Sequence, residues 1–370
     1  MRVLHVLNRL RPSGAETMLR LAAGPWQREG VELEIMCLGS ELGEYAPSLL
    51  DVGYRIHHLP LRPVHRFVPS FMSFLWAGDY DIIHVHPERA NIAIATAARF
   101  VGRAGVVRTI HSNFNFEGKL RWKRRMQRAF LQRSGVRHVA IGESVAETEM
   151  TTFDNPTSVI FNTFDEHRFR PPLQEEREQA RTALGLADPE LAVVMVGNCS
   201  RTKNHRAVFE ALALPSAPPV RLFHVGIEDE ESFGERQLVA QLGLSDRVDF
   251  LGFHGDVPSL LHAADCFVMP SHYEGMSIAG LEALACGVPC ILADVVGLRD
   301  LRAHVPDIWW VTPDPASIAD ALAGVAELDE EQLHRWRMTT APLIRERFGI
   351  ARHSSAYLKL YRELAEPRAS

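Results

Sequence analysis

The sequence predicts an α/β protein of two doubly wound domains, each a largely parallel sheet with helices on both faces. The first observation is length, because 370 residues exceed what one hydrophobic core usually serves. The second is a repeated alternation of short apolar runs with helix-like stretches, which is typical of parallel sheets. The third is a charged, proline-containing segment at residues 170–176, which interrupts the alternation and is predicted to be the interdomain linker.

The first domain is expected to span residues 1–165. Its predicted strands are the apolar runs 3–7, 31–38, 56–59, 81–86, 106–111, 136–141 and 158–161. A helical pattern follows the first strand, and others occur at 91–100 and 118–132. Parallel strands need such crossover connections, so this order favours a parallel sheet.

The second domain is expected to span residues 176–347. Its predicted strands are 191–196, 220–225, 247–251, 265–269, 288–293 and 308–311, with helices at 207–214, 235–242, 257–263 and 276–286. A last helix, at about 348–365, carries Tyr357, Leu360, Tyr361 and Leu364 on one face and is expected to pack back on the first domain. Two such domains imply a ligand cleft between them, at the carboxyl ends of the strands.

Composition excludes several classes of protein. A net charge of −6 gives no general basis for binding nucleic acid. The N-terminus does not have the pattern of a secretory signal, and no uncharged run approaches the roughly 20 residues of a spanning helix. We therefore expect a cytoplasmic protein, at most touching the inner face of the cell membrane. The cysteines form no CxxC pair and are predicted to be buried, reduced thiols: Cys37, Cys199, Cys266, Cys286 and Cys290.

Residues that directly follow strands are the first candidates for chemistry. Ser13 and Gly14 follow the first strand and begin a helix, which allows close backbone approach and favours an anion. His111 follows a strand in the same domain, and so does His86. A histidine at a strand end is more often structural than catalytic, and His84 is expected to face the core.

The segment 197–204 follows a strand of the second domain and supplies two cations, Arg201 and Lys203. They stand beside Gly197 and Asn198 at the start of a helix, a combination suited to a phosphate. An ordinary solvated loop with two surface charges would show the same sequence pattern. Gly226, after the next strand, is another glycine that would let the backbone approach a ligand closely.

The stretch 272–290 is the strongest single feature, because Glu274 and Glu282 lie eight positions apart around a helix start. Glu274 and Gly275 form a turn after an apolar strand. The two carboxylates could accept hydrogen bonds from hydroxyl groups on two parts of one ligand. The helix is expected to begin near Met276, so an anion would be met by the N–H groups of Met276, Ser277 and Ile278.

No metal site and no cofactor are predicted. Asp79 and Asp81 form a DxD pattern, which can bind a divalent metal. They precede their strand, however, and so lie at the wrong end of the sheet for a ligand.

Together these segments resemble the retaining nucleotide-sugar glycosyltransferases of family four. That family has the GT-B fold, in which two Rossmann-like domains face a central cleft. The resemblance runs nearly end to end and is closest to polysaccharide-assembly members. Its most specific motif is the E-x7-E pattern of Glu274 and Glu282, supported by the segments 13–16, 197–204, 250–257 and 347–350.

The resemblance implies a role for each candidate residue. Glu282 would accept from the ribose and Glu274 from the donor sugar, while His111 would face that sugar. Arg201 and Lys203 would neutralise the diphosphate and the charge that develops on the leaving nucleotide. The catalytic residues would thus be His111, Arg201, Lys203 and Glu274. Donor binding would further involve Ser13, Gly14, Gly197, Asn198, Gly226, Phe253 near the base, Gly275, Met276, Ser277, Ile278 and Glu282.

The implied activity is metal-independent hexosyl transfer, with retention, from a nucleotide-sugar co-substrate to a glycan or lipid-linked acceptor in cell-surface polysaccharide synthesis. The expected donor is a UDP-sugar, and front-face attack assisted by the leaving phosphate would need no side-chain nucleophile. Two alternatives stay open: glycosylation of a small-molecule natural product, and a catalytically silent GT-B subunit that binds a partner enzyme. The chain departs from the family at Ser13, Asn198 and Thr163, which replace a glycine, an arginine and a glycine.

One local segment, residues 119–137, is strongly basic and contains no acidic residue. Apolar side chains including Trp122 and Phe130 are interleaved with its lysines and arginines. A basic amphipathic helix of this kind can lie on an anionic membrane, although a helix with one core face and one solvated face has the same pattern. The membrane interpretation predicts that charge reversal at Arg124, Arg125 and Arg128 abolishes binding to anionic liposomes.

Overall fold

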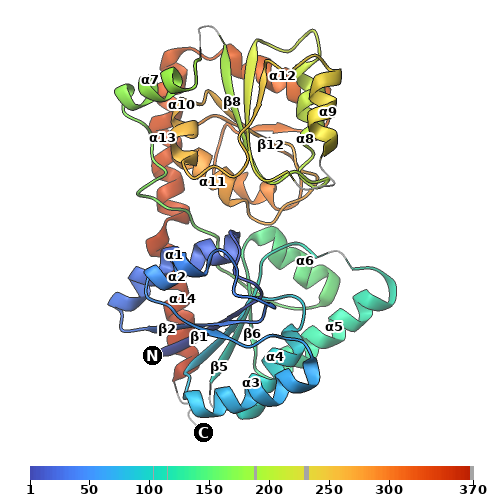
Figure 1. Ribbon diagram of the computed structural model, residues 1–370, viewed down its shortest axis with the longest axis vertical. Coiled ribbons are helices and arrows are strands. Elements are labelled where there is room, and N and C mark those ends of the chain that lie inside the picture. The colour runs from blue at the N-terminus through green and yellow to red at the C-terminus, as the bar shows by residue number, and fades with distance from the viewer. Residues whose placement is uncertain (103, 115, 187–189, 229–232, 367–370) are drawn as a thin grey trace. The chain divides into compact units, whose positions relative to one another are not determined.

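The computed structural model describes residues 1–366 except 103, 115, 187–189 and 229–232 (Figure 1). The chain forms two compact units. The N-terminal unit comprises Met1–Thr163 together with Ile350–Ser370, and the C-terminal unit comprises Phe164–Gly349.

The N-terminal unit is built on a parallel sheet whose described strands run in the order β3-β2-β1-β4-β5-β6-β7. These strands are β1 (Arg2–Leu7), β2 (Glu32–Cys37), β3 (Arg55–His58), β4 (Ile82–Val85), β5 (Gly105–Ile110), β6 (Arg137–Ala140) and β7 (Ser158–Val159). Its helices are α1 (Gly14–Arg28), α2 (Ala46–Asp51), α3 (Val64–Gly78), α4 (Asn91–Val101), α5 (Gly118–Arg133), α6 (Glu143–Phe153) and α14 (Ile350–Ala365).

Helices cover both faces of this sheet, and successive residues of β1 pack on opposite sides. Val3 and Leu7 join a core with side chains of α1 and α14, whereas Leu4 and Val6 join a core with α3 and α4. Burial on both faces is what makes the central strands read as continuous apolar runs in the sequence.

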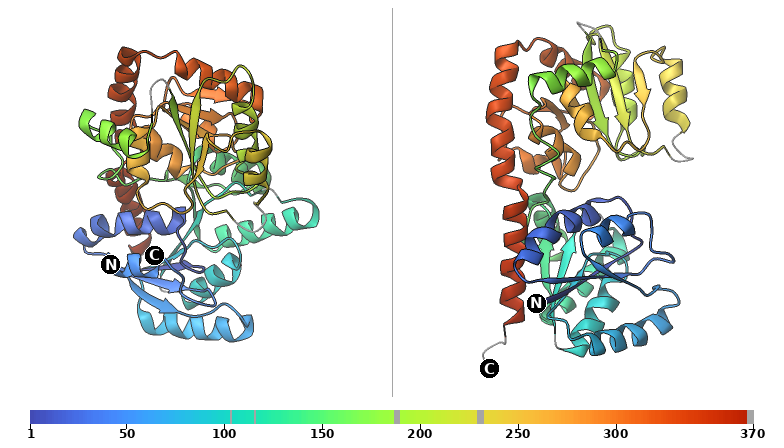
Figure 2. Two further views of the ribbon diagram at one scale, coloured as in Figure 1. Left: turned by 45° about the horizontal axis from the view of Figure 1, so that its top comes forward. Right: turned by 60° about the vertical axis from the view of Figure 1, so that its left-hand side comes forward.

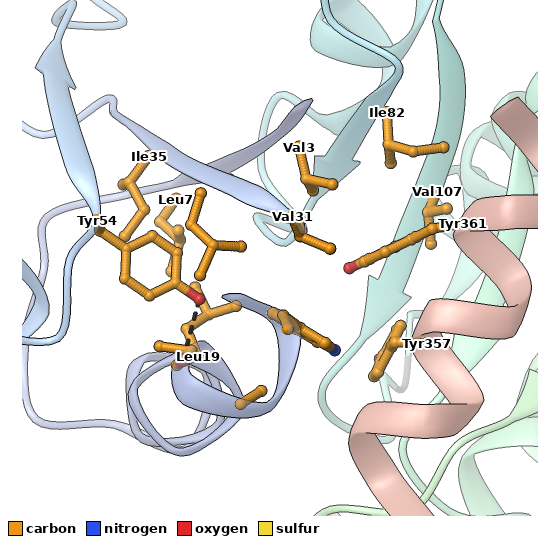
Figure 3. Close-up of a cluster of buried hydrophobic side chains, with 14 of the residues drawn as sticks. Val3, Leu7, Leu19, Val31, Ile35, Tyr54, Ile82, Val107, Tyr357 and Tyr361 are labelled. Carbon is orange, nitrogen blue, oxygen red and sulfur yellow. Dashed lines mark hydrogen bonds between the residues drawn. The ribbon is translucent and has the colours of Figure 1, made fainter. Parts of the chain in front are cut away.

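The C-terminal helix α14 completes the core of the N-terminal unit. Tyr357 and Tyr361 extend from α14 toward Ile82 and Val107 of the sheet (Figure 3). The indole Nε1 of Trp26, on α1, donates to the Ser354 carbonyl at 3.1 Å. Helix α14, in the darkest red, can be followed beside the sheet of this unit in Figure 2. The last helix of the chain is therefore structurally part of the unit formed by the first residues.

The C-terminal unit repeats the architecture with the strand order β10-β9-β8-β11-β12-β13 among its described residues. Its strands are β8 (Leu191–Val196), β9 (Val220–Val225), β10 (Val248–Phe250), β11 (Cys266–Met269), β12 (Cys290–Ala293) and β13 (Trp309–Val311). Its helices are α7 (Gln174–Ala183), α8 (His205–Leu212), α9 (Phe233–Gln241), α10 (Val257–Ala263), α11 (Ile278–Ala285), α12 (Pro315–Ala326) and α13 (Glu330–Phe348), with a 3₁₀ turn η2 (Leu298–Leu301).

The predicted fold class is confirmed, since both sheets are parallel and flanked by helices. Each predicted strand overlaps a strand of the structure, and the cysteines are buried thiols outside any disulfide, as expected. The segment 170–176 is only partly irregular, because α7 already begins at Gln174. In that first turn Glu176 accepts from the Leu173 N–H at 2.7 Å, and this contact caps the helix.

In each sheet the strand order reverses between two central neighbours. These are β1 and β4 in the N-terminal unit, and β8 and β11 in the C-terminal unit. Loops that leave such neighbours diverge, so ligands of open α/β sheets bind at this switch point, beyond the carboxyl ends of the strands. The loops concerned contain Ser13, His86, the segment 197–204 and the segment 270–277.

Candidate active site

The loop after β8 is fastened to the neighbouring strand at its first residue. The Gly197 N–H donates to the Val225 carbonyl at 2.8 Å, and its φ is +155°. Gly226 passes so close that a Cβ at this position would lie 2.1 Å from the Gly197 oxygen. Both positions therefore require glycine. Gly197 requires it for its backbone angle, and Gly226 for its backbone angle and for space. The sequence predicts that Gly226 lets the backbone approach a ligand, and in the structure its close contact is with the Gly197 backbone.

Asn198 has a structural role that the sequence does not suggest. Its side-chain Oδ1 accepts from the Ile227 N–H at 2.9 Å, which joins the loop after β8 to the loop after β9. The Cys199 N–H donates in turn to the Ile227 carbonyl at 3.0 Å. The Asn198 side chain thus braces the loop after β8.

Lys203 and Glu274 form the centre of the site in the C-terminal unit. The Nζ of Lys203 lies 2.6 Å from Glu274 Oε1, and the Ser271 hydroxyl donates to the same oxygen at 2.7 Å. The side chains are 28% and 13% exposed, so the pair is only partly open to solvent. The cation predicted for phosphate and the carboxylate predicted for sugar are therefore adjacent.

Backbone contacts explain why these two loops meet. The His272 N–H donates to the Thr202 carbonyl at 2.8 Å. The side-chain amide of Asn204 donates to the carbonyls of Pro270 and Pro313, at 3.1 and 3.0 Å. Asn204 adopts the left-handed conformation with φ 55°, which asparagine tolerates better than most residues. The neighbouring Arg201 is exposed at the tip of the loop.

The turn before α11 is also held tightly. The Glu274 N–H donates to the Val296 carbonyl at 3.2 Å, and Gly297 leaves room for the Glu274 carbonyl, which a Cβ would meet at 2.1 Å. Ser277 caps the helix, because its hydroxyl accepts from the Gly280 N–H at 3.2 Å. The helix therefore begins at Ile278, slightly later than predicted.

The remaining candidates of this unit surround that turn. Met276 is buried, while Gly275 and Ile278 are half-buried. Glu282 is half-buried in the middle of α11, more than one turn beyond the cap. Phe253 is 71% exposed in the loop after β10, and the preceding residue, Gly252, accepts from the Gly226 N–H at 2.9 Å. The loops that follow β8, β9, β10 and β11 are thus linked by hydrogen bonds.

In the N-terminal unit, Ser13 and Gly14 begin α1 as predicted. Ser13 is the N-cap, and its hydroxyl donates to the Glu16 carboxylate. Burial raises the pKa of that carboxyl above its ordinary value, while the Ser13 hydrogen bond opposes the shift. Ser13 and Gly14 themselves are exposed at the helix start.

His111 lies at the end of a row of histidines that runs from the buried His5 through the half-buried His86. Its Nε2 is 3.0 Å from His86 Nδ1, and His86 Nε2 is 3.1 Å from His5 Nδ1. His84 faces the core, as predicted, and binds the Tyr361 hydroxyl and Thr109 Oγ1, each at 2.7 Å. Burial lowers the pKa of His5 to about 3 and the pKa of His111 to about 4. These imidazoles are therefore neutral near pH 7.

Two groups of described residues have the composition of a metal site, with ligand atoms within 4.8 Å of one another. They are His5, His84 and His86, and Cys199, His205 and His224. In the first group both ring nitrogens of His84 are engaged in hydrogen bonds. In the second, His224 Nε2 lies 2.9 Å from the Gly197 carbonyl and the Gly197 backbone also binds His205. Hydrogen bonds thus occupy ring nitrogens in both groups, while His5 Nε2, His205 Nδ1 and His224 Nδ1 have no hydrogen-bond partner among the described residues.

The sequence alone did not reveal four contributors: Ser271, Asn204 and His224 behind Gly197 in the C-terminal unit, and His86 as a partner of His111 in the N-terminal unit. Each acts through a neighbour that is distant in sequence. The available signal was position, since Ser271, His86 and His224 lie within two residues of the carboxyl end of a strand and Asn204 lies in the loop that follows β8.

Comparisons with known proteins agree with this architecture. Residues 12–168 match the family described as "Glycosyltransferase Family 4", and residues 176–341 match "Glycosyl transferases group 1". HepE of Anabaena, solved in complex with UDP, superposes with a TM-score of 0.85 at 22% identity, over 98% of this chain and 100% of HepE. The fold is therefore GT-B, the class defined by two such domains.

Two relatives are similar in sequence. EpsF of Bacillus subtilis (strain 168), whose name assigns it provisionally to the glycosyltransferases, is 28% identical over 309 residues, which are 80% of this chain and 79% of EpsF. The UDP-Gal:alpha-D-GlcNAc-diphosphoundecaprenol alpha-1,3-galactosyltransferase of Escherichia coli is 30% identical over 240 residues, 62% of this chain and 61% of that protein. The two matched regions together cover most of the sequence, and the chain belongs to the family 4 glycosyltransferases.

Proposed function

We propose that this glycosyltransferase moves a hexosyl group, with retention, from a UDP-sugar to a glycan or lipid-linked glycan acceptor in cell-surface polysaccharide synthesis. The observation that carries the proposal is the contact of Lys203 with Glu274 at the switch point of the C-terminal sheet. A cation and a carboxylate held side by side suit a ligand in which a sugar is joined to a phosphate. The HepE structures with UDP, with UDP and glucose and with UDP-glucose support this donor class.

The proposed chemistry follows from the charges that change during transfer. The bond between the anomeric carbon and the diphosphate breaks, so positive charge develops on the sugar and negative charge on the leaving phosphate. Lys203 and the exposed Arg201 would stabilise the phosphate in the role that a metal has in other enzymes. Glu274, which Lys203 and Ser271 already hold, would accept from a sugar hydroxyl, and Glu282 from the ribose. The acceptor hydroxyl would attack the anomeric carbon from the face that the leaving group vacates, and its proton would pass to the leaving phosphate.

The donor class is tested by thermal unfolding with a panel of UDP-, GDP- and ADP-sugars, because a ligand that binds only the folded state raises Tm. We expect stabilisation by one or more UDP-sugars. The linkage of the transferred sugar, read from the anomeric proton coupling in NMR, tests retention. Transfer to a small molecule alone would favour the natural-product alternative, and absence of binding by every nucleotide-sugar would contradict the proposal.

Helix α5 presents the features that a lipid-linked acceptor would require. Trp122, Met126 and Phe130 are 67%, 51% and 51% exposed and recur every four residues, so they share one side of the helix. Lys119, Lys123 and Arg133 fall on the same side and are also exposed. This membrane face, defined by these six residues, supports our proposal of peripheral contact with an anionic membrane.

The structure shows that the membrane contact should be tested at residues other than the three arginines that the sequence suggests. Arg128 is buried in an ion pair with Glu149, Arg125 binds Asp154 at 3.1 Å, and Arg124 lies over the Phe116 ring at 5.2 Å. Charge reversal at these three arginines would therefore disturb folding as well as any lipid contact. The sequence-based prediction that Arg128 contributes to lipid binding is wrong, because Arg128 is buried and donates to Glu149 of α6.

We expect the triple substitution Lys119→Glu, Lys123→Glu and Arg133→Glu to abolish cosedimentation with vesicles containing phosphatidylserine or phosphatidylglycerol. Each cation near an anionic surface contributes about 1 kcal/mol, so reversing three lowers binding by more than roughly 100-fold. The control variant reverses three exposed cations elsewhere in the same unit, Arg89, Arg352 and Lys359, and should still bind. Equal binding of both triple variants would rule out the membrane face.

A further inference from the structure

The three histidines His5, His86 and His111 form a continuous hydrogen-bonded row in the N-terminal unit. They come from β1, from the residue after β4 and from the residue after β5, which are adjacent strands. The two links are His5 Nδ1 to His86 Nε2, at 3.1 Å, and His86 Nδ1 to His111 Nε2, at 3.0 Å. Every ring nitrogen along the row is thus used, apart from one at each end.

The surroundings fix the rings as well as their hydrogen bonds. The His5 ring stacks on Trp26 with an interplanar angle of 9°, and the His84 ring lies 4.1 Å from the His86 ring. His84 is itself held to α14 by its hydrogen bond with Tyr361. Strand β5 is held to the same helix by the hydrogen bond between Thr109 and Tyr357, at 2.9 Å. Rotation of His86 would therefore require repacking of the buried core.

A neutral imidazole carries one N–H and one bare nitrogen, so the row can be ordered in only two directions. In one, His5 donates to His86 and His86 donates to His111, which leaves a bare Nε2 at the buried end of the row. In the other, His111 donates inward and His5 is left with a buried N–H. Among the described residues His5 Nε2 has no hydrogen-bond partner, and it is fully buried. An orphaned N–H in a core is rarer than an orphaned acceptor, which favours the outward direction.

The outward direction determines the state of His111. Its Nε2 accepts from His86, so its single proton must reside on Nδ1. His111 is half-buried, and the described part of the structure gives its Nδ1 no hydrogen-bond partner. The row thus ends in an N–H group that is available to an acceptor oxygen.

We propose that His86 is a positioning residue, which, with His5, locks His111 into the Nδ1–H form so that it donates a hydrogen bond to a hydroxyl oxygen of the donor sugar. The inference rests on the proposed function for the identity of this ligand, while the order of the protons rests on the geometry of the row alone. Asp or Glu could orient a histidine in the same way, but here a second histidine does so without bringing a charge.

Two substitutions at His86 separate polarity from packing. His86→Gln keeps an N–H donor for His111 and an oxygen acceptor for His5, whereas His86→Leu removes both. We expect His86→Leu to lower kcat by roughly tenfold, as for the loss of one hydrogen bond, with a smaller change in KM. His86→Gln should retain activity within about threefold of the wild type. Equal losses in both variants at unchanged Tm would overturn the positioning role.

The deciding measurement is the tautomer of His111 in the full-length protein labelled with ¹⁵N-histidine. We expect a protonated Nδ1 and a bare Nε2 in the wild type and in His86→Gln, and a shift away from this form in His86→Leu. The His111 signals are assigned by their loss in His111→Gln. A protonated Nε2 on His111 in the wild type would refute the proposal, whether or not the Leu variant folds.

This readout also separates the inference from the proposed function. A protonated Nδ1 in a protein that binds none of the nucleotide-sugars would support the row and contradict the proposed donor. Binding and transfer in a protein whose His111 carries its proton on Nε2 would support the function and overturn the row. Neither result depends on the other measurement.

Discussion

Replacing Lys203 with methionine is expected to lower kcat/KM for sugar transfer by about 10²–10³-fold, the range for removing one preorganised group that stabilises developing charge. Lys203 is the cation that the structure holds beside Glu274, at 2.6 Å, and methionine keeps most of the stem while removing the charge. The asparagine at position 198 makes this dependence stronger, since its side chain is occupied by the Ile227 N–H and brings no charge.

The measurement is steady-state release of the nucleoside diphosphate, with Tm recorded for each variant. Arg206→Met is the matched control, because Arg206 lies three residues further on, is exposed and pairs with Glu210 along α8. Such surface pairs contribute little, so this variant should retain activity within about twofold. An unchanged kcat/KM for Lys203→Met would remove the lysine from the proposed mechanism.

Glu149→Gln is expected to destabilise the N-terminal unit by about 3–5 kcal/mol, the range for breaking a buried ion pair from one side. Glu149 is buried on α6 and accepts from Arg128 Nε and Nη2, at 2.7 and 2.8 Å, and from Asn155 at 2.7 Å. Burial lowers the pKa of Arg128, but the hydrogen bonds and charges of Glu149 and Glu88 together outweigh burial and raise that pKa. Without the carboxylate, the carboxylate that remains in contact with Arg128 is that of Glu88, at the longer distance of 3.4 Å.

The loss can be measured by denaturant unfolding of the whole chain. Glu147→Gln on the exposed side of the same helix is the control and should change stability by less than about 0.5 kcal/mol. The double variant Arg128→Met, Glu149→Leu should regain much of the loss, because a buried pair can often be replaced by packed apolar groups. A single variant as stable as its control would show that the pair contributes nothing.

The fold could be predicted from the sequence because parallel strands buried on both faces appear as continuous apolar runs. The runs at Leu191–Val196 and Val220–Val225 match the observed strands at both ends. Polar amphipathic helices show a weaker hydrophobic pattern in the sequence. Helix α7 has no buried residue, and its first residues, 174–176, fall in the segment that the charge pattern predicts to be the linker. Its stability comes instead from the contacts of Arg177 and Arg181 with Asp265, which no local pattern reveals.

The sequence predicted which residues lie at the candidate site, but it did not predict which of them are in contact. Strand ends indicated Lys203 and Glu274 separately, but only the adjacency of β8 and β11 brings them into contact. The same holds for His111 and His86, whose pairing depends on the register of β4 and β5. Arg128 shows the opposite error: a basic segment predicts exposure, yet Glu149 supplies a partner from another helix.

The most direct test of the central claim, that the C-terminal unit binds a nucleotide-sugar, is thermal unfolding of the wild type and of Lys203→Met with UDP-sugars. A ligand at 100 times its Kd stabilises the folded state by about 2.7 kcal/mol. For a unit of this size that corresponds to a Tm increase of roughly 5–10 °C. We predict this increase for the wild type with at least one UDP-sugar and a much smaller one for Lys203→Met. No increase with any nucleotide-sugar, or equal increases in both proteins, would contradict the account.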